Sequence, residues 1–241
     1  MNFGIIAAGE GSRLATEGVS LPKPLVPING IPMIGRLFKI FDSLGAGKIS
    51  VIVNEYMTEV AAYVSRTAPL LNAEVKMVVK TTPSSMHSFY ELGRLMRGDG
   101  RFVLTTVDTI FREADFQRYV EAWRNAPANV RAMMAVTRFV DDEKPLYVKT
   151  TPDMHVSAFL DADPDGTAEY VSGGIYGLDD GAIDALNDCL ERGVSRMRNY
   201  QRALLESGLE VKAFNMGKIL DVDHAGDIEK AERFLKTLKT E

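Results

Sequence analysis

The sequence has little cysteine and histidine, and this scarcity limits its chemistry. Cys189 is the only cysteine, so no disulfide can form within the chain, which suits a reducing cytoplasm. No two of the three histidines, His87, His155 and His224, are spaced as metal ligands. We therefore expect neither a disulfide framework nor a histidine-based metal site.

Long apolar runs and an excess of positive charge are also missing. The N-terminal apolar run of residues 3–8 stops at Gly9, too short to cross a bilayer, and shows no signal-peptide pattern. With 33 acidic and 28 basic residues the net charge is −5, which argues against nucleic-acid or anionic-membrane partners. We expect a soluble cytoplasmic protein, monomeric or homo-oligomeric. Its 241 residues, 46% of them hydrophobic, can bury a core without disulfides.

Strand-like and helix-like patterns alternate along the first half of the chain. Nearly continuous apolar runs, typical of strands covered on both faces, occupy residues 3–8, 49–53, 75–79 and 102–107. Helical periodicity lies between them, over residues 32–44 and 89–96. This alternation predicts right-handed crossovers and a mainly parallel sheet, hence an α/β fold.

The second half is less regular. Short strands, some of them antiparallel, are predicted at residues 133–137, 147–150, 155–159 and 174–178, with exposed connections at 141–144 and 161–167. Helices are predicted at 181–190 and 196–205. A last helix places five apolar side chains on one stripe, namely Ile228, Ala231, Phe234, Leu235 and Leu238.

The most informative segment follows the first predicted strand. The loop Gly9-Glu10-Gly11-Ser12-Arg13 leads, ten residues later, to Lys23 within Leu21-Pro22-Lys23-Pro24-Leu25. Glycines after a strand let backbone N–H groups approach a phosphate chain, and Arg13 and Lys23 would add positive charge there. The flanking prolines stiffen the backbone around Lys23.

Other interpretations of this loop are simpler. Gly-x-Gly after a strand is often only a tight turn, and Lys23 could be a solvated lysine. A P-loop is excluded because no Gly-Lys-Ser/Thr follows, and a dinucleotide fingerprint fits poorly because Leu14 replaces its third glycine. The combination of strand, paired glycines, arginine and a lysine between prolines favours a nucleotide site.

Three segments together resemble a known family. They are Ala7-Ala8-Gly9-Glu10-Gly11-Ser12-Arg13-Leu14, Pro22-Lys23-Pro24-Leu25-Val26-Pro27 and Gly30-Ile31-Pro32-Met33-Ile34. Their order and spacing resemble the signature of the sugar nucleotidyltransferases, the nucleoside-diphosphate-sugar pyrophosphorylases. The resemblance implies a Rossmann-like three-layer α/β/α fold, Mg²⁺ dependence, and transfer of a nucleoside monophosphate from a triphosphate to a phosphorylated acceptor.

The resemblance also implies roles for residues of this chain. It predicts one domain, 1–241, with a nucleotide-binding half to about residue 110 and an acceptor-binding half from 111. Arg13 and Lys23 are the expected catalytic cations. The expected nucleotide contacts are Ala7, Ala8, Gly9, Gly11, Ser12 and Ser85.

Two aspartates are the candidate Mg²⁺ ligands. Asp108 follows the apolar run 102–107 and should lie at the carboxyl edge of the sheet, where α/β proteins bind ligands. In the resembling family an aspartate before the last helix completes the metal site, which indicates Asp221. Asp223 has a competing interpretation as the N-cap of that helix, although the two could exchange roles.

No protein nucleophile is needed for such a reaction. An anionic phosphate oxygen of the acceptor would attack the α-phosphorus in line and expel pyrophosphate, so no general base is required. Catalysis then depends on positioning and on neutralising charge.

The acceptor side matches the family less well. His87, Gly174 and Tyr176 occupy family segments that contact base and acceptor, although Ser85 could simply cap a helix. Sugar-specific relatives usually carry a Glu-Lys-Pro whose lysine meets the sugar phosphate, whereas residues 159–164 contain no lysine. Lys149 could replace it, or the acceptor could be a smaller phosphate or phosphonate such as phosphocholine. Four arginines around one helix, Arg192, Arg196, Arg198 and Arg202, are expected to be solvated.

Two other functions compete. A glycosyltransferase would use Asp221-Val222-Asp223 as an Asp-x-Asp metal motif, but it would not need the Arg13 and Lys23 pair. A catalytically silent nucleotide or sugar-phosphate sensor would keep the fold without pyrophosphate release. The identity of the base is left open, since uridine, thymidine, cytidine and guanosine enzymes share the signature.

Overall fold

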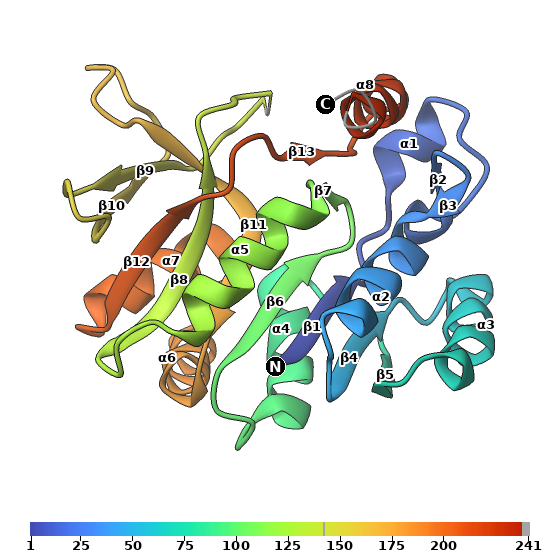
Figure 1. Cartoon of the computed structure of the whole chain (residues 1–241), viewed down its shortest axis with the longest axis horizontal. Coiled ribbons are helices and arrows are strands. Elements are labelled where there is room, and N and C mark those ends of the chain that lie inside the picture. Colours follow the sequence, from blue (N-terminus) through green and yellow to red (C-terminus); the bar gives the residue numbers. More distant parts are fainter. Residues whose placement is uncertain (142, 238–241) are drawn as a thin grey trace.

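Four parallel strands form one half of the central sheet (Figure 1). β1 (Asn2–Ala7) lies between β4 (Lys48–Val53) and β6 (Phe102–Thr106), and β5 (Glu74–Val79) pairs with β4. The strands predicted from the apolar runs are thereby confirmed in this computed structural model, which describes residues 1–141 and 143–237. β5 differs from the expectation of burial on both faces. It is an edge strand, and its side chains are exposed or half-buried.

The second half of the chain extends the same sheet. β11 (Tyr170–Leu178) runs antiparallel to β6 and joins the two halves. Within the described residues the sheet has nine strands in the order β10-β9-β11-β6-β1-β4-β5, with β8 pairing both β11 and β12. The additional strands are β8 (Val130–Thr137), β9 (Tyr147–Thr150), β10 (Val156–Leu160) and β12 (Glu210–Asn215).

Helices cover both faces of the sheet and produce three layers. One core cluster joins α2, α3, α5 and α8 to one face, and a second joins α4, α6 and α7 to the other. The predicted α/β fold with a mixed sheet is therefore confirmed. The helices are α1 (Ser12–Thr16), α2 (Met33–Ser43), α3 (Thr58–Thr67), α4 (Ser85–Met96), α5 (Glu113–Arg124), α6 (Asp180–Glu191), α7 (Met197–Glu206) and α8 (Ala225–Lys236), with 3₁₀ turns at Lys23–Leu25 and Ala68–Leu70.

Two short antiparallel strand pairs complete the architecture. β2 (Pro27–Ile28) pairs with β3 (Ile31–Pro32), and β7 (Thr109–Ile110) pairs with β13 (Leu220–Asp221). Figure 1 shows β13 crossing above the sheet toward α8 and α1. The segment carrying Asp221 is therefore brought back to the N-terminal loop.

The last helix follows the predicted apolar stripe. Ala231 and Phe234 are buried, and Ile228 and Leu235 are partly buried against the same core. Leu238 of that stripe lies outside the described residues. Over residues 1–141 and 143–237, no helix has both the length and the apolar character needed to cross a membrane.

Candidate active site

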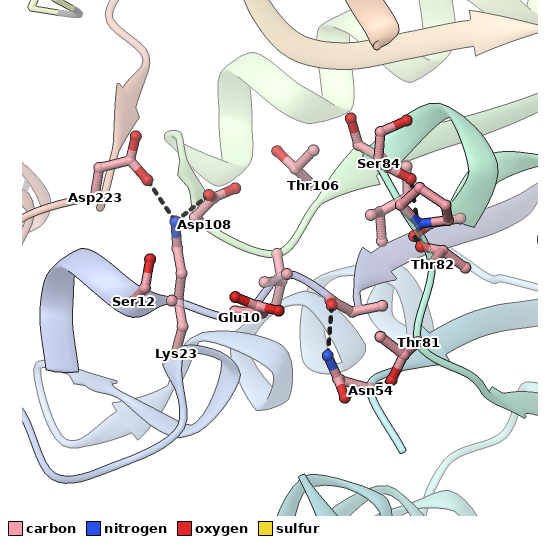
Figure 2. Close-up of a pocket in the computed structure, with 18 of the residues that line it drawn as sticks. Glu10, Ser12, Lys23, Asn54, Thr81, Thr82, Ser84, Thr106, Asp108 and Asp223 are labelled. Atoms are coloured by element: carbon pink, nitrogen blue, oxygen red, sulfur yellow. Dashed lines mark hydrogen bonds and ion pairs between the residues drawn. The ribbon is translucent and has the colours of Figure 1, made fainter. Parts of the chain in front are cut away.

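A cavity of about 550 Å³ opens at the carboxyl edge of the parallel strands (Figure 2). Residues that follow four of these strands line it: Ala8 after β1, Asn54 after β4, Thr81 after β5 and Asp108 after β6. Parallel strands end at one edge of a sheet, so the residues following them converge there. The cavity thus lies where ligands bind in open α/β sheets.

The glycine loop forms one wall of this cavity. Gly9, Gly11 and Ser12 line it, and α1 begins at Ser12. Gly11 has a left-handed φ of 64°, and a Cβ there would come within 2.7 Å of the Lys23 Cβ. The second glycine is therefore required both by the turn and by the side chain that passes over it.

Of the six predicted nucleotide contacts, five lie in this cavity. Ala8, Gly9, Gly11, Ser12 and Ser85 are among its lining residues. Ala7 is fully buried in the core on the other face of β1. We therefore remove Ala7 from the site.

Lys23 is held between two carboxylates. Its side chain is only 10% exposed, and its Nζ contacts Asp108 Oδ2 and lies 2.6 Å from Asp223 Oδ1 (Figure 2). Burial alone would lower the pKa of Lys23, but the two carboxylates raise it above its ordinary value. The lysine is therefore a fixed positive charge at the cavity wall.

Asp223 connects both predicted catalytic cations. Besides Lys23, its Oδ2 lies 3.0 Å from Arg13 Nη1. The predicted N-cap role of Asp223 is wrong: His224 is the N-cap of α8, and the Asp227 carboxylate accepts hydrogen bonds from the backbone N–H groups of His224 and Asp223. Because His224 caps the helix, the Asp223 carboxylate is available to pair with Arg13 and Lys23.

Asp108 and Asp221 are brought together by the pairing of β7 with β13. Asp221 is opposite Thr109 and accepts a hydrogen bond of 3.0 Å from its Oγ1, while Val222 N donates to Asp108 O at 3.1 Å. Desolvation by the surrounding residues and the like charge of Asp108 raise the pKa of Asp221 above its ordinary value, although Asp221 itself is exposed to solvent. Burial also tends to raise the pKa of Asp108, but Lys23 holds it below its ordinary value.

This pair of carboxylates fits a magnesium ion. Among the described residues Asp221 has no ion-pair partner and Asp108 pairs only with Lys23, and carboxylate oxygens are preferred Mg²⁺ ligands. No cluster of three or more metal-binding side chains occurs in the described part of the chain. A bound Mg²⁺ would therefore take its other ligands from water and substrate phosphates.

A second cavity, of about 290 Å³, adjoins the first. The two share Ser85, Thr106, Asp108 and Asp223, and the second adds Asp221 with the predicted acceptor residues Gly174 and Tyr176. Gly174 lies in an irregularity of β11 with a φ of 71°, and a Cβ there would come within 2.7 Å of Thr109 Oγ1. This glycine allows β11 to pass close to Thr109, the residue that donates a hydrogen bond to Asp221.

Two predicted acceptor residues lie elsewhere. His87 is in the first turn of α4, where its Nδ1 is 2.9 Å from Ser84 Oγ, and it lines neither cavity. Lys149 lies on β9, near the far edge of the sheet, and also lines neither cavity. The N-cap position of α4 belongs to Ser84, not to Ser85.

Sequence reasoning missed residues at both ends of the site. Arg196, which is exposed as expected, and the half-buried Arg198 line the second cavity together with Gln201. Asn54 fixes the far end of the first cavity, because its Nδ2 donates to Ala8 O and its Oδ1 accepts from Thr81 Oγ1. The position of Asn54 directly after a buried strand was the available signal. No local sequence pattern indicates that Arg196 and Arg198 lie at the site.

A family of known domains matches more than half of the chain. Residues 4–170 match the family model of the MobA-like NTP transferase domain. A 2-aminoethylphosphonate cytidylyltransferase of Lancefieldella rimae is 34% identical over 86 residues, 35% of each chain, and a bifunctional protein GlmU of Clavibacter sepedonicus is 37% identical over 65 residues, 27% of this chain and 13% of that protein. The matched segments thus span about a third or less of these relatives' lengths.

Solved structures share the fold over nearly the whole chain. A protein of Bacillus anthracis assigned as a glucose-1-phosphate thymidylyltransferase superposes with a TM-score of 0.84 at 19% identity, covering 99% of this chain and 96% of that one. The inositol-1-phosphate CTP transferase of T. maritima gives 0.76 at 15% identity, with 97% of each chain covered. These likenesses establish the Rossmann-like fold.

Proposed function

Since the chain belongs to the family of MobA-like NTP transferase domains, we propose that it is a nucleotidyltransferase that joins a nucleoside triphosphate to a sugar 1-phosphate and releases pyrophosphate. One observation carries the proposal: a cavity with a glycine loop, Arg13 and Lys23 meets a second cavity at Asp108. The first cavity suits a triphosphate, and the second suits the molecule that attacks it.

The side chains have distinct roles in this reaction. The acceptor's anionic phosphate oxygen attacks the α-phosphorus in line, forming one P–O bond while the bond to pyrophosphate breaks. Arg13 and Lys23 stabilise the charge that develops on the phosphates. Asp108 and Asp221 would hold Mg²⁺, which when bound neutralises phosphate charge and fixes phosphate orientation. Asp223 orients the two cations.

Arg196 is the proposed anchor for the acceptor phosphate. It replaces the lysine that the sequence lacks at residues 159–164. Within residues 1–141 and 143–237 its guanidinium has no ion-pair partner, whereas Arg198 is held by Asp161 at 2.6 Å. Arg196 also has an unfavourable φ of 72°, a strain of about 1–3 kcal/mol that is typical of functional sites.

A small phosphonate is the second candidate acceptor. The match to a 2-aminoethylphosphonate cytidylyltransferase, 34% identical over 86 residues, favours it. Both candidates use the same cations and carboxylates. They differ in what the acceptor presents beyond its phosphorus atom.

Pyrophosphate release tests the proposal. Each common nucleoside triphosphate is paired with glucose 1-phosphate, N-acetylglucosamine 1-phosphate, phosphocholine and 2-aminoethylphosphonate, with Mg²⁺ or with EDTA. We expect release with one pair, abolished by EDTA, and roughly 10²–10³-fold slower in Asp108→Asn. Asp184→Asn, an exposed aspartate paired with Arg97, is the matched control. Nucleotide binding with no release from any pair would support the silent sensor instead.

A further inference from the structure

Gln201 is a buried polar side chain at the acceptor cavity. It lies on α7, is 2% exposed, and lines the cavity together with Ser172 and Arg196. A polar group removed from water to this extent is costly unless it is hydrogen-bonded. Its partners therefore show what the cavity is built to hold.

Only one half of the Gln201 amide has a partner. Ser172 Oγ donates to Gln201 Oε1 at 2.9 Å, and Ser172 itself is fixed because its backbone N donates to Leu146 O at 2.9 Å. Among the described residues nothing accepts a hydrogen bond from Gln201 Nε2. The carboxamide is thus held with its oxygen satisfied and its two N–H donors available at the cavity.

Gln201 and Arg196 line the same cavity from neighbouring positions of one element. Arg196 is the N-cap of α7, with a non-helical φ of 72°, and Gln201 lies in the second turn of the helix. The Arg196 guanidinium offers donors only, and Gln201 has its N–H donors unpaired, so these two side chains suit oxygen acceptors.

We infer that Gln201 determines acceptor specificity by donating a hydrogen bond to an uncharged hydroxyl or carbonyl oxygen of the acceptor. This inference rests on the proposed function, because it assumes that the second cavity takes the acceptor. It selects a hydroxylated phosphate, such as a sugar phosphate, over aminoalkyl phosphonates and phosphocholine.

Calorimetric binding without nucleotide tests the inference. The probes are glucose 1-phosphate, N-acetylglucosamine 1-phosphate, 2-aminoethylphosphonate and inorganic phosphate, each in Mg²⁺. We expect wild type to bind at least one sugar phosphate more tightly than 2-aminoethylphosphonate. Gln201→Met should weaken that sugar phosphate about tenfold, the value of one hydrogen bond, and leave inorganic phosphate unchanged.

Two further variants separate recognition from structural damage. Ser172→Ala keeps the amide but frees its orientation, so a smaller loss for the sugar phosphate alone is expected. Gln117→Met, on the exposed face of α5, should change neither affinity. Equal weakening of sugar phosphate and inorganic phosphate, tighter binding of 2-aminoethylphosphonate, or no sugar-phosphate binding would overturn the inference. Sugar-phosphate binding without pyrophosphate release would contradict the proposed function alone.

Discussion

Gly11 has two constraints that an ordinary turn glycine lacks. Its φ of 64° disfavours any side chain, and a methyl group would also collide with Lys23. Gly11→Ala should lose about 1–2 kcal/mol of stability from the backbone and at least tenfold in pyrophosphate release from displacement of Lys23. Denaturant unfolding and initial rates measure the two effects.

Gly18 provides the matched control for this change. It has a φ of 88°, yet a Cβ there would meet no atom within 4 Å. Gly18→Ala should therefore show a similar loss of stability with nearly normal activity. If both variants lose activity equally, the Lys23 contact does not explain the second glycine.

Lys23 stabilises the charge of its two carboxylate partners and, in the proposed reaction, that of the substrate. In Lys23→Met we expect pyrophosphate release to fall roughly 10²–10³-fold, since one fixed cation is removed from the phosphates. The melting temperature should also fall, because Asp108 is left without its ion pair. Lys76→Met, which breaks the exposed pair with Glu74, should change neither quantity. An unchanged rate in Lys23→Met would exclude the lysine from catalysis.

At the residue scale, the sequence identifies groups near the glycine loop better than their partners. Arg13 and Lys23 follow from a local pattern of glycines and prolines. The Lys23–Asp223 pair joins residues 200 positions apart, and no local pattern encodes such a contact. For the same reason no local pattern indicates that the exposed Arg196 lines the second cavity.

At the element scale, α8 is attached to the end of α1 through Glu17. The Oε1 of Glu17 lies 2.6 Å from His224 Nδ1, and its Oε2 accepts from Ala225 N at 2.6 Å. The hydrogen bond with His224 lowers the pKa of Glu17, and the same bond, helped by Glu143 and Asp227, raises the pKa of His224. The two residues are adjacent only because α8 returns to α1.

These opposite shifts predict a pH window for the attachment. The stability due to Glu17 is present above its ordinary pKa of 4.5 and lost on acidification, whereas that due to His224 is present below 6.5 and lost as pH rises through its raised pKa. The melting-temperature difference between wild type and Glu17→Gln should be largest between these values and smaller at pH 9. Glu232→Gln, which contacts Asn29 at the other end of α8, should show no such decrease at high pH.

Element prediction succeeded where a segment carries its own signal. The buried strands and α2, α4, α6 and α7 have apolar patterns long enough to be recognised. α5 was missed although Phe116, Tyr119, Val120 and Trp123 share one face, because its polar residues are numerous. α1 has five residues and β7 and β13 have two each, so their formation depends on tertiary pairing.

At the scale of the whole molecule, the sheet lies between two apolar cores, and at Gly177 a side chain of one core packs directly against the strand backbone. Gly177 on β11 lies under the Trp123 ring, and a Cβ would approach that ring to 2.8 Å. Gly177→Ala should therefore cost about 1–3 kcal/mol of unfolding free energy, measured by urea denaturation followed by fluorescence of this single tryptophan.

A glycine in open space gives the comparison. Gly226 lies in the first turn of α8 with no atom within 4 Å of an added Cβ, so Gly226→Ala should leave stability unchanged or slightly higher. Destabilisation of Gly226→Ala equal to that of Gly177→Ala would rule out packing under Trp123 as the cause.

The division of the domain into two halves near residue 110 stays a prediction. β6 and β11, which lie on opposite sides of that boundary in the sequence, pair directly in the sheet.

The joining of Lys23 to Asp223 also has a consequence for synthesis. A ribosome adding about 5–20 residues per second makes the glycine loop on the order of 10–40 s before the aspartate 200 positions later. During that interval the loop's cations lack Asp223 and the proposed magnesium site lacks Asp221. Under the proposed function, an incomplete chain would therefore not consume triphosphate until nearly all of this sequence has been translated.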